Sequence, residues 1–405
     1  MNWMITNAVL PGRPGRWSIA VDDGRIAGVI EGTSPAAAFG TRAGTWDADG
    51  RLVSAAFVDP HLHIDKALTA ARVDDAVAPV DLQAAIRAVR TLKMAFTAPD
   101  VAARATRALE MGLVHGTTIA RTNCEADAFV ELRAVEGMQV AASGIAGRVD
   151  LQIVAFPQEG WFETPGTLES GAGRWIARAI ERGVRIVGGN VNKRVWPSDP
   201  ERQVDETFDL AGRHDCDIDY HLDNWDDAAV FTLPYVARKT IARGWQGRVA
   251  VSHIPSLSCV SDAAAADAID AVVKAGISVC VLPTRIRLTR VLELIEAGAN
   301  VVCGTDNLRD PFVRFGDADP LKALLLLAQI TNQLHNAGLE RLWETMTGAA
   351  ARMLRCVDYG LEPGSAADLV VFDAPSVPDA ILLQAARLAV IKGGKQLAGS
   401  VPVTS

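Results

Sequence analysis

The sequence predicts an α/β protein in which a (β/α)8 barrel carries a small β-sandwich domain built from both ends of the chain. From residue 53 onward, apolar strand-like segments alternate with alanine-rich helical segments. The starts of the second to seventh candidate strands lie 33, 34, 32, 32 and 30 residues apart, which is the length that one strand, one helix and two loops require. Strands this rich in Val, Ile and Ala are typical of parallel strands buried on both faces, and eight of them favour a closed barrel.

The first fifty residues predict short strands of a different kind. Segments 17–22 and 25–30 flank Asp23-Gly24, a dipeptide that favours a tight hairpin turn because glycine accepts positive φ. Strand character returns at 367–373 and 388–395, near the other end of the chain. We therefore expect residues 1–52 and 360–405 to form one composite β-sandwich domain, and residues 53–359 to form the barrel.

The barrel segment divides into eight candidate strands. They begin near Val53, Thr117, Asp150, Val184, Cys216, Arg248, Ser278 and Asn300. The longer gap after the first strand holds two helical stretches, 80–96 and 100–112, and this insertion is expected to cap the barrel mouth. After the eighth strand, Asp319-Pro320 is a favourable start for a helix over 321–334.

Composition narrows the class of partner. A formal net charge of -8 without a basic run argues against nucleic acid. The longest apolar run, 323–328, is too short to cross a bilayer, and no secretory signal pattern opens the sequence. Six cysteines without C-x-x-C spacing fit reduced thiols in the cytoplasm. We expect a soluble cytoplasmic protein that binds a small molecule; association with copies of itself stays open.

Histidines gather at the predicted strand ends. The first strand ends in His61-Leu62-His63, and the period of two places both imidazoles on one face. The fifth strand ends at His221, the sixth at His253 and the eighth at Asp306. Because barrel active sites lie at the carboxyl ends of the strands, these side chains are expected to converge. Each histidine taken singly is compatible with a structural hydrogen bond, but the set favours a metal site.

Three imidazoles and one carboxylate suit a divalent cation and leave one position open for water. Zinc fits these ligands best, although iron and manganese also accept them. Such a metal would lower the pKa of the water toward neutrality and supply hydroxide as a nucleophile.

Several stretches together resemble the cytosine deaminase branch of the amidohydrolase superfamily. They are residues 57–65, 150–160, 221–227 and 304–311, within a likeness that covers nearly the whole chain. The resemblance implies that one metal is bound by His61, His63, His221 and Asp306. It also implies that His253 hydrogen-bonds the water and stabilises developing charge, and that Gln158 contacts the substrate ring.

The chain departs from the deaminase pattern at three positions. Asn224 stands where the deaminases carry a proton-shuttling glutamate, Asn307 replaces a second carboxylate, and Asn123 replaces a second-strand histidine. An amide cannot exchange a proton at pH 7. We therefore expect Asn224 and Asn307 to contact a substrate other than cytosine itself.

With the glutamate absent, Asp306 is expected to take a proton from the water and deliver it to the leaving nitrogen. Asp223 is a second candidate, although orientation of a ligand histidine is its expected role. Lys66 and Lys193 raise the alternative of a two-metal site bridged by a carboxylated lysine. Lys193 lies beyond the predicted strand end, which favours one metal.

Three tryptophans on predicted βα loops, Trp161, Trp196 and Trp225, could stack on a planar ring. The sequence thus predicts a metal-dependent hydrolase that cleaves a C–N bond of a small, nitrogen-rich, cyclic compound by deamination, amine removal or ring opening. The alternative is a catalytically silent relative that keeps the fold and the metal.

Overall fold

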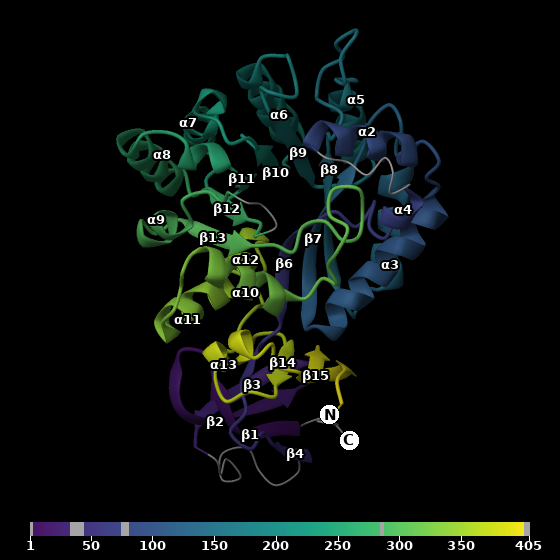
Figure 1. The fold of residues 1–405 in the computed structure, drawn as a ribbon. Coiled ribbons are helices and arrows are strands. Elements are labelled where there is room, and N and C mark those ends of the chain that lie inside the picture. The colour runs from purple at the N-terminus through teal and green to yellow at the C-terminus, as the bar shows by residue number, and fades with distance from the viewer. Residues whose placement is uncertain (1–2, 33–43, 74–80, 284–286, 401–405) are drawn as a thin grey trace.

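A computed structural model describes residues 3–32, 44–73, 81–283 and 287–400. Its central sheet has eight parallel strands, which neighbour one another in chain order (Figure 1). They are β6 (Phe57–Leu62), β7 (Thr117–Glu125), β8 (Asp150–Phe156), β9 (Ile186–Val191), β10 (Asp217–Leu222), β11 (Val249–His253), β12 (Ser278–Val281) and β13 (Asn300–Cys303). The backbone N–H of Asp306 donates to the carbonyl of His61 across 3.0 Å, and a parallel bridge joins Leu62 to Asp306. These contacts close the sheet into the predicted barrel.

The strand rhythm of the sequence is confirmed from the second strand onward, where observed starts lie within two residues of the predicted ones. The first strand is divided. Val53–Ala55 form a separate strand, β5, in which Val53 pairs with Val371 of the small domain, and the barrel strand begins at Phe57. The division of the chain after residues 52 and 359 stays a prediction, and this pairing favours assigning Val53–Ala55 to the small domain.

Helices surround the barrel. They are α2 (Leu82–Lys93), α3 (Ala98–Val114), α4 (Arg133–Gly144), α5 (Ala172–Glu181), α6 (Pro200–His214), α7 (Leu233–Arg243), α8 (Asp262–Lys274), α9 (Val291–Glu296), α10 (Pro320–Ile330), α11 (Asn336–Glu344) and α12 (Gly348–Met353). As expected, two helices fill the gap between the first two barrel strands, and Asp319 caps α10 by accepting from the Leu321 amide. Within the described residues, every helix is too short or too polar to span a lipid bilayer.

The small domain is a sandwich of two four-stranded sheets. One contains β1 (Trp3–Leu10), β2 (Arg13–Asp22), β3 (Arg25–Glu31) and β4 (Gly44–Asp47); the other contains β5, β14 (Leu369–Phe372), β15 (Arg387–Lys392) and β16 (Lys395–Ala398). Helix α13 (Val377–Leu382) lies between β14 and β15 in the chain. Ile5 and Ile19 from the first sheet share a buried apolar core with Leu369 and Ile391 from the second. The composite origin predicted from the two termini is therefore confirmed.

An aromatic cluster joins the two parts of the molecule. Phe57 of β6, Trp343 of α11 and Phe372 of β14 are buried, with ring centroids 4.9 to 5.8 Å apart. Figure 1 shows the small domain at one end of the molecule, with α2, α5 and α6 at the other.

Candidate active site

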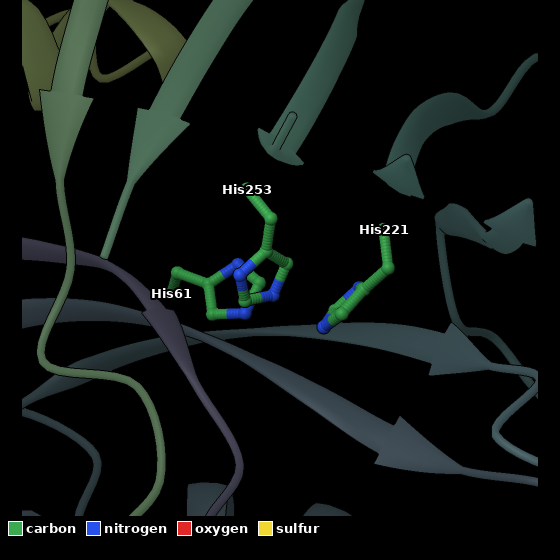
Figure 2. Close-up of side chains that lie close together, drawn as sticks. All are labelled: His61, His221 and His253. Atoms are coloured by element: carbon green, nitrogen blue, oxygen red, sulfur yellow. The ribbon is translucent and has the colours of Figure 1, made fainter. Parts of the chain in front are cut away.

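Four barrel strands deliver the five predicted metal and catalytic side chains to one place. His61 and His63 come from the end of β6, His221 from β10 and His253 from β11, while Asp306 follows β13. All five are buried. Figure 2 shows the rings of His61, His221 and His253 converging from different elements. The convergence follows from parallel strands, whose carboxyl ends meet at one face of a barrel.

The donor atoms of the four predicted metal ligands lie close together. His63 Nε2 is 3.3 Å from His61 Nε2 and 3.0 Å from His221 Nε2. Asp306 Oδ1 is 3.8 Å from His61 Nε2 and 3.6 Å from His63 Nε2. Burial, followed by the charges of Arg121 and Lys66, lowers the pKa of His61 to about 3. Burial also lowers the pKa of His221 well below its usual range.

With their pKa lowered in this way, the rings of His61 and His221 are neutral and offer lone pairs rather than protons. Neutral imidazole is the form that binds a metal ion. Two overlapping triads, His61 with His63 and Asp306, and His61 with His221 and His253, each place their donor atoms within 4.8 Å of one another. The residues therefore fit a divalent cation. His253 also lies close enough to contact whatever is bound at the cation.

Two of these side chains are carried by a left-handed backbone. His253 has φ of 73° and Asp306 has φ of 65°. A non-glycine residue in this region costs about 1 to 2 kcal/mol, with asparagine and aspartate the most tolerant. The turn re-aims each side chain at the point where its strand ends, so the site stores backbone strain that its surroundings offset.

Asp59 links the first and last strands beneath the site. Its carboxylate accepts hydrogen bonds from the amide of His61 (3.3 Å) and from the amide (3.2 Å) and hydroxyl (2.5 Å) of Thr305, the residue before Asp306. Burial raises the pKa of Asp59 to about 7. This buried side chain thus fixes His61 and Asp306 relative to each other, a role that the sequence did not reveal.

A pocket opens beside the cluster. Besides four site residues it is lined by Leu82, Ile86, Phe156, Gln158, Asn190, Asn192, Val195, Trp196, Asn224, Asn307 and Phe312. The three predicted substrate contacts, Gln158, Asn224 and Asn307, are all among them. Asn190 and Asn192 were missed, although the run Gly188-Gly-Asn-Val-Asn at the end of β9 was a usable signal.

Of the three predicted tryptophans, one lines the pocket. Trp196 lines the pocket, whereas Trp225 is absent from the described lining residues. The indole N–H of Trp161 instead donates to Glu206, 2.9 Å away, next to α5. Trp161 therefore has a packing role.

Asp223 differs from expectation, whereas the position of Lys193 agrees with it. The carboxylate of Asp223 accepts from the amides of Thr232 (2.6 Å) and Leu233 (3.0 Å), so it caps the start of α7 instead of orienting a ligand histidine. Burial raises the pKa of Asp223 to about 7. Lys193 is exposed and does not line the pocket as described. Asn123 is buried, with Nδ2 3.4 Å from His61 Nδ1.

A buried charge network, unforeseen from the sequence, lies beside the pocket. Lys66 Nζ is 3.3 Å from His63 Nδ1 and 2.9 Å from Glu125 Oε1. Glu125 also binds Lys93 of α2, through Oε2 at 2.5 Å. The two buried lysines thus share one carboxylate, and the network connects His63, a candidate metal ligand, to the helix over the barrel mouth.

Comparison with known proteins is consistent with this geometry. The model of the "Amidohydrolase family" matches residues 91–398. The chain is 34% identical over 358 residues to the N-isopropylammelide isopropyl amidohydrolase of Pseudomonas sp. (strain ADP), covering 86% of each protein. It is 28% identical over 403 residues to a pterin deaminase of Rhizobium rhizogenes, covering 95% of this chain and 88% of the relative.

Among solved structures, 5-methylcytosine deaminase from Klebsiella pneumoniae, liganded with phosphonocytosine, superposes with a TM-score of 0.89. It is 28% identical and the match covers 99% of this chain and all of that one. The matched proteins share the fold of this chain and belong to the same branch, which is a class of metal-dependent hydrolases. The chain is therefore an enzyme of the amidohydrolase family, in its cytosine deaminase-like branch, and hydrolyses carbon–nitrogen bonds other than peptide bonds.

Proposed function

We propose that this enzyme removes an amine from the ring of a small, neutral, nitrogen-rich heterocycle, using one divalent metal ion bound by His61, His63, His221 and Asp306. The observation that carries the proposal is the cluster of four donor atoms beside a pocket lined mainly by amide and apolar side chains. The relative that is named for an amidohydrolase reaction on N-isopropylammelide supports amine removal over ring opening.

Different side chains carry different steps of the proposed reaction. A divalent cation at this position would lower the pKa of a water molecule toward neutrality and so supply the nucleophile. Asp306 takes one proton from that water and delivers it to the departing nitrogen. His253 hydrogen-bonds the attacking oxygen and stabilises the charge that develops on it. The water oxygen bonds to the ring carbon, the C–N bond breaks, and the products are the ring carbonyl compound and the free amine.

The lining of the pocket selects the charge of the substrate. Gln158, Asn190, Asn192, Asn224 and Asn307 each offer both a donor and an acceptor. Such amides complement a ring edge on which carbonyl and N–H groups alternate. Among the described lining residues, Asp306 is the sole carboxylate, and lysine and arginine are absent. Apart from Asp306 and the proposed cation, a charged substrate would therefore find no counter-ion among these lining residues, and cytosine would lack the glutamate that its deaminases use.

Zinc is the proposed metal, because imidazole and carboxylate ligands suit it, with iron and manganese as the alternatives. Metal analysis of the purified protein decides among the three. A cytoplasmic location and the absence of a nucleic-acid partner stay predictions from cysteine spacing and charge.

The test is a substrate panel with the metal-loaded enzyme. N-isopropylammelide, pterin, 5-methylcytosine and cytosine are each incubated with it, and released isopropylamine or ammonia is measured. We expect turnover of the triazine and little or none of cytosine. If a fully metal-loaded enzyme turns over no member of the panel, the catalytically silent alternative replaces this proposal.

A further inference from the structure

We infer that Leu82 and Ile86 of α2, together with Phe312, bind the hydrocarbon substituent of the departing amine, so that the enzyme prefers an N-alkylamino ring to the same ring with an unsubstituted amino group. The inference rests on the proposed function and adds the element that sets its specificity. It follows from the apolar part of the pocket lining, from the helix that supplies it and from the contacts that hold this helix.

Apolar side chains line part of the pocket, beside the amides that would face a polar ring. Leu82, Ile86, Val195, Trp196 and Phe312 share the lining with the amides. Stacking of the ring can occupy Trp196, but branched aliphatic side chains have no hydrogen bonds to offer. An unsubstituted amino group would leave the exposed parts of Leu82 and Phe312 facing water, whereas an alkyl group would bury these parts favourably.

Leu82 and Ile86 lie on one face of α2 because they are four residues apart. Asp81 fixes the start of this helix, since its carboxylate accepts from the amide of Ala84 at 2.7 Å. Ile86 is 1% exposed, and Leu82 is half-buried. The helix therefore presents a continuous apolar strip to the pocket, with Arg87 on its exposed side.

The far end of α2 is anchored by buried charges. Lys93 Nζ contacts Glu125 and Asp127, each at 2.5 Å, and Glu159 at 2.8 Å. Arg90 binds the same Glu159 and donates to the Leu168 carbonyl at 2.7 Å. These contacts fix the strip relative to the carboxyl ends of β7 and β8, which is what a specificity-determining surface requires.

The anchor also connects the two halves of the pocket. Glu159, to which α2 is attached, is the next residue after Gln158, a polar side chain of the lining. A substrate that binds its ring edge at Gln158 would thus meet an apolar strip held by the neighbouring residue. We expect the ring and its alkyl group to be recognised by the two parts together.

The experiment compares two substrates that differ only in the alkyl group, N-isopropylammelide and its unsubstituted analogue ammelide. Leu82→Ala and Ile86→Ala are measured beside Arg87→Ala, an exposed control on the same helix. We expect each of the first two variants to lower kcat/KM for N-isopropylammelide about 10-fold, with less than about threefold change for ammelide. Arg87→Ala should leave both values unchanged.

A bulky variant distinguishes a change of specificity from a folding defect. Leu82→Trp at the pocket rim should exclude the isopropyl group and reverse the preference between the two rings. Equal losses on both substrates, or no loss on either, would overturn the inference while leaving the proposed function intact. Failure of the wild-type enzyme on both rings would also overturn the inference if another compound of the substrate panel is turned over, and it would contradict the proposed function itself if none is.

Discussion

His61 belongs to both groups of candidate metal-binding residues, so it is the most informative residue to substitute. Its ring belongs to the triad with His63 and Asp306 and to the triad with His221 and His253. It is fully buried, and its backbone amide and carbonyl bind Asp59 and Asp306. Substitution of this side chain therefore tests the site with the backbone contacts retained.

We expect His61→Ala to lose bound metal and to reduce kcat/KM by at least about 1,000-fold, because a ligand and the supply of nucleophile are lost together. Elemental analysis and the substrate panel measure both. The control is His214→Ala, in which an exposed histidine at the end of α6 is removed. Chelation should lower the melting temperature of the wild type but not of His61→Ala. Unchanged metal content in His61→Ala would refute the ligand assignment.

Asp306 calls for a different substitution because of its backbone. Its φ of 65° is tolerated by aspartate and asparagine but strained in alanine. Asp306→Asn removes the charge and the proton carrier while keeping the turn, so we expect loss of activity with a free energy of unfolding within about 1 kcal/mol of the metal-free wild type. Denaturant titration beside the amine-release assay checks this. Large destabilisation would mean that the carboxylate has a structural role.

Asn224 is the residue at which the chain departs most clearly from the deaminases. The side chain lines the pocket and is half-buried. If the pocket otherwise resembles that of the deaminases, Asn224→Glu adds the missing proton shuttle and should raise ammonia release from cytosine at least about 10-fold. The matched variant Asn224→Gln, which adds length without an acid, should not. Equal rates for both variants would show that the pocket has been rebuilt for another ring.

At the scale of elements, the position of α2 depends on the buried ion pairs of Lys93. Burial alone would lower the pKa of Lys93, but attraction to Glu125, Asp127 and Glu159 outweighs it and raises this pKa. The ammonium therefore stays charged, and it compensates carboxylates from two strand ends. Without Lys93, Glu125 would keep Lys66 and Glu159 would keep Arg90, but Asp127 would lose the lysine that it contacts. The buried network would then carry uncompensated negative charge.

We expect Lys93→Met to destabilise the protein by about 3 to 5 kcal/mol, as measured by urea unfolding. Lys274→Met is the matched control: its exposed lysine forms an ion pair with Asp270 on the same helix face, which is worth about 0.5 kcal/mol or less. A loss below about 1 kcal/mol in Lys93→Met would mean that the network is not needed to hold α2.

The barrel strands could be predicted from the sequence and the pocket-lining face of α2 could not, for a physical reason. Barrel strands could be placed because each must bury an apolar segment, and their polar ends follow from parallel pairing; β7 and β13 begin where expected. The insertion was expected at the barrel mouth, but its lining residues, Leu82 and Ile86, could not be identified. Their orientation depends on ion pairs between Lys93 and distant strand ends. Such tertiary contacts leave no local pattern in the sequence from which they could be predicted.

The same limit applies to individual side chains. The convergence of His61, His63, His221 and Asp306 could be predicted because each lies at the end of a predicted parallel strand, and the resemblance to the deaminases implied that they bind a metal. Asp223 was assigned to the wrong partner, because a carboxylate after a strand can equally cap the next helix. The role of Asp59 depends on Thr305, which is 246 residues away in the chain, and no sequence pattern links the two.

At the scale of the whole molecule, barrel and sandwich share a core. Phe57, Trp343 and Phe372 contact one another across the junction. Lys392 of the sandwich adds an ion pair of 2.5 Å to Asp150 at the start of β8. We therefore expect the two parts to unfold in a single transition.

Phe372→Ala should lower the free energy of unfolding by about 3 to 5 kcal/mol, because it leaves a cavity in a fully buried aromatic cluster. Tryptophan fluorescence and far-ultraviolet circular dichroism should give coincident transitions during the titration. Leu383→Ala, which removes an exposed side chain after α13, should change stability by less than about 0.5 kcal/mol. Two separated transitions in the wild type would show that the parts fold independently.

The division of the first predicted strand has a mechanical consequence. Only Ala56 separates β5, a strand of the sandwich, from β6, the strand that carries His61 and His63. A tether of one residue, hydrogen-bonded through its amide to Asp368, gives no room for a hinge. The sandwich therefore cannot swing away from the barrel to admit a substrate. We therefore expect substrates to enter at the opposite end, where α2 lines the pocket, while the small domain holds the strand that carries His61 in place.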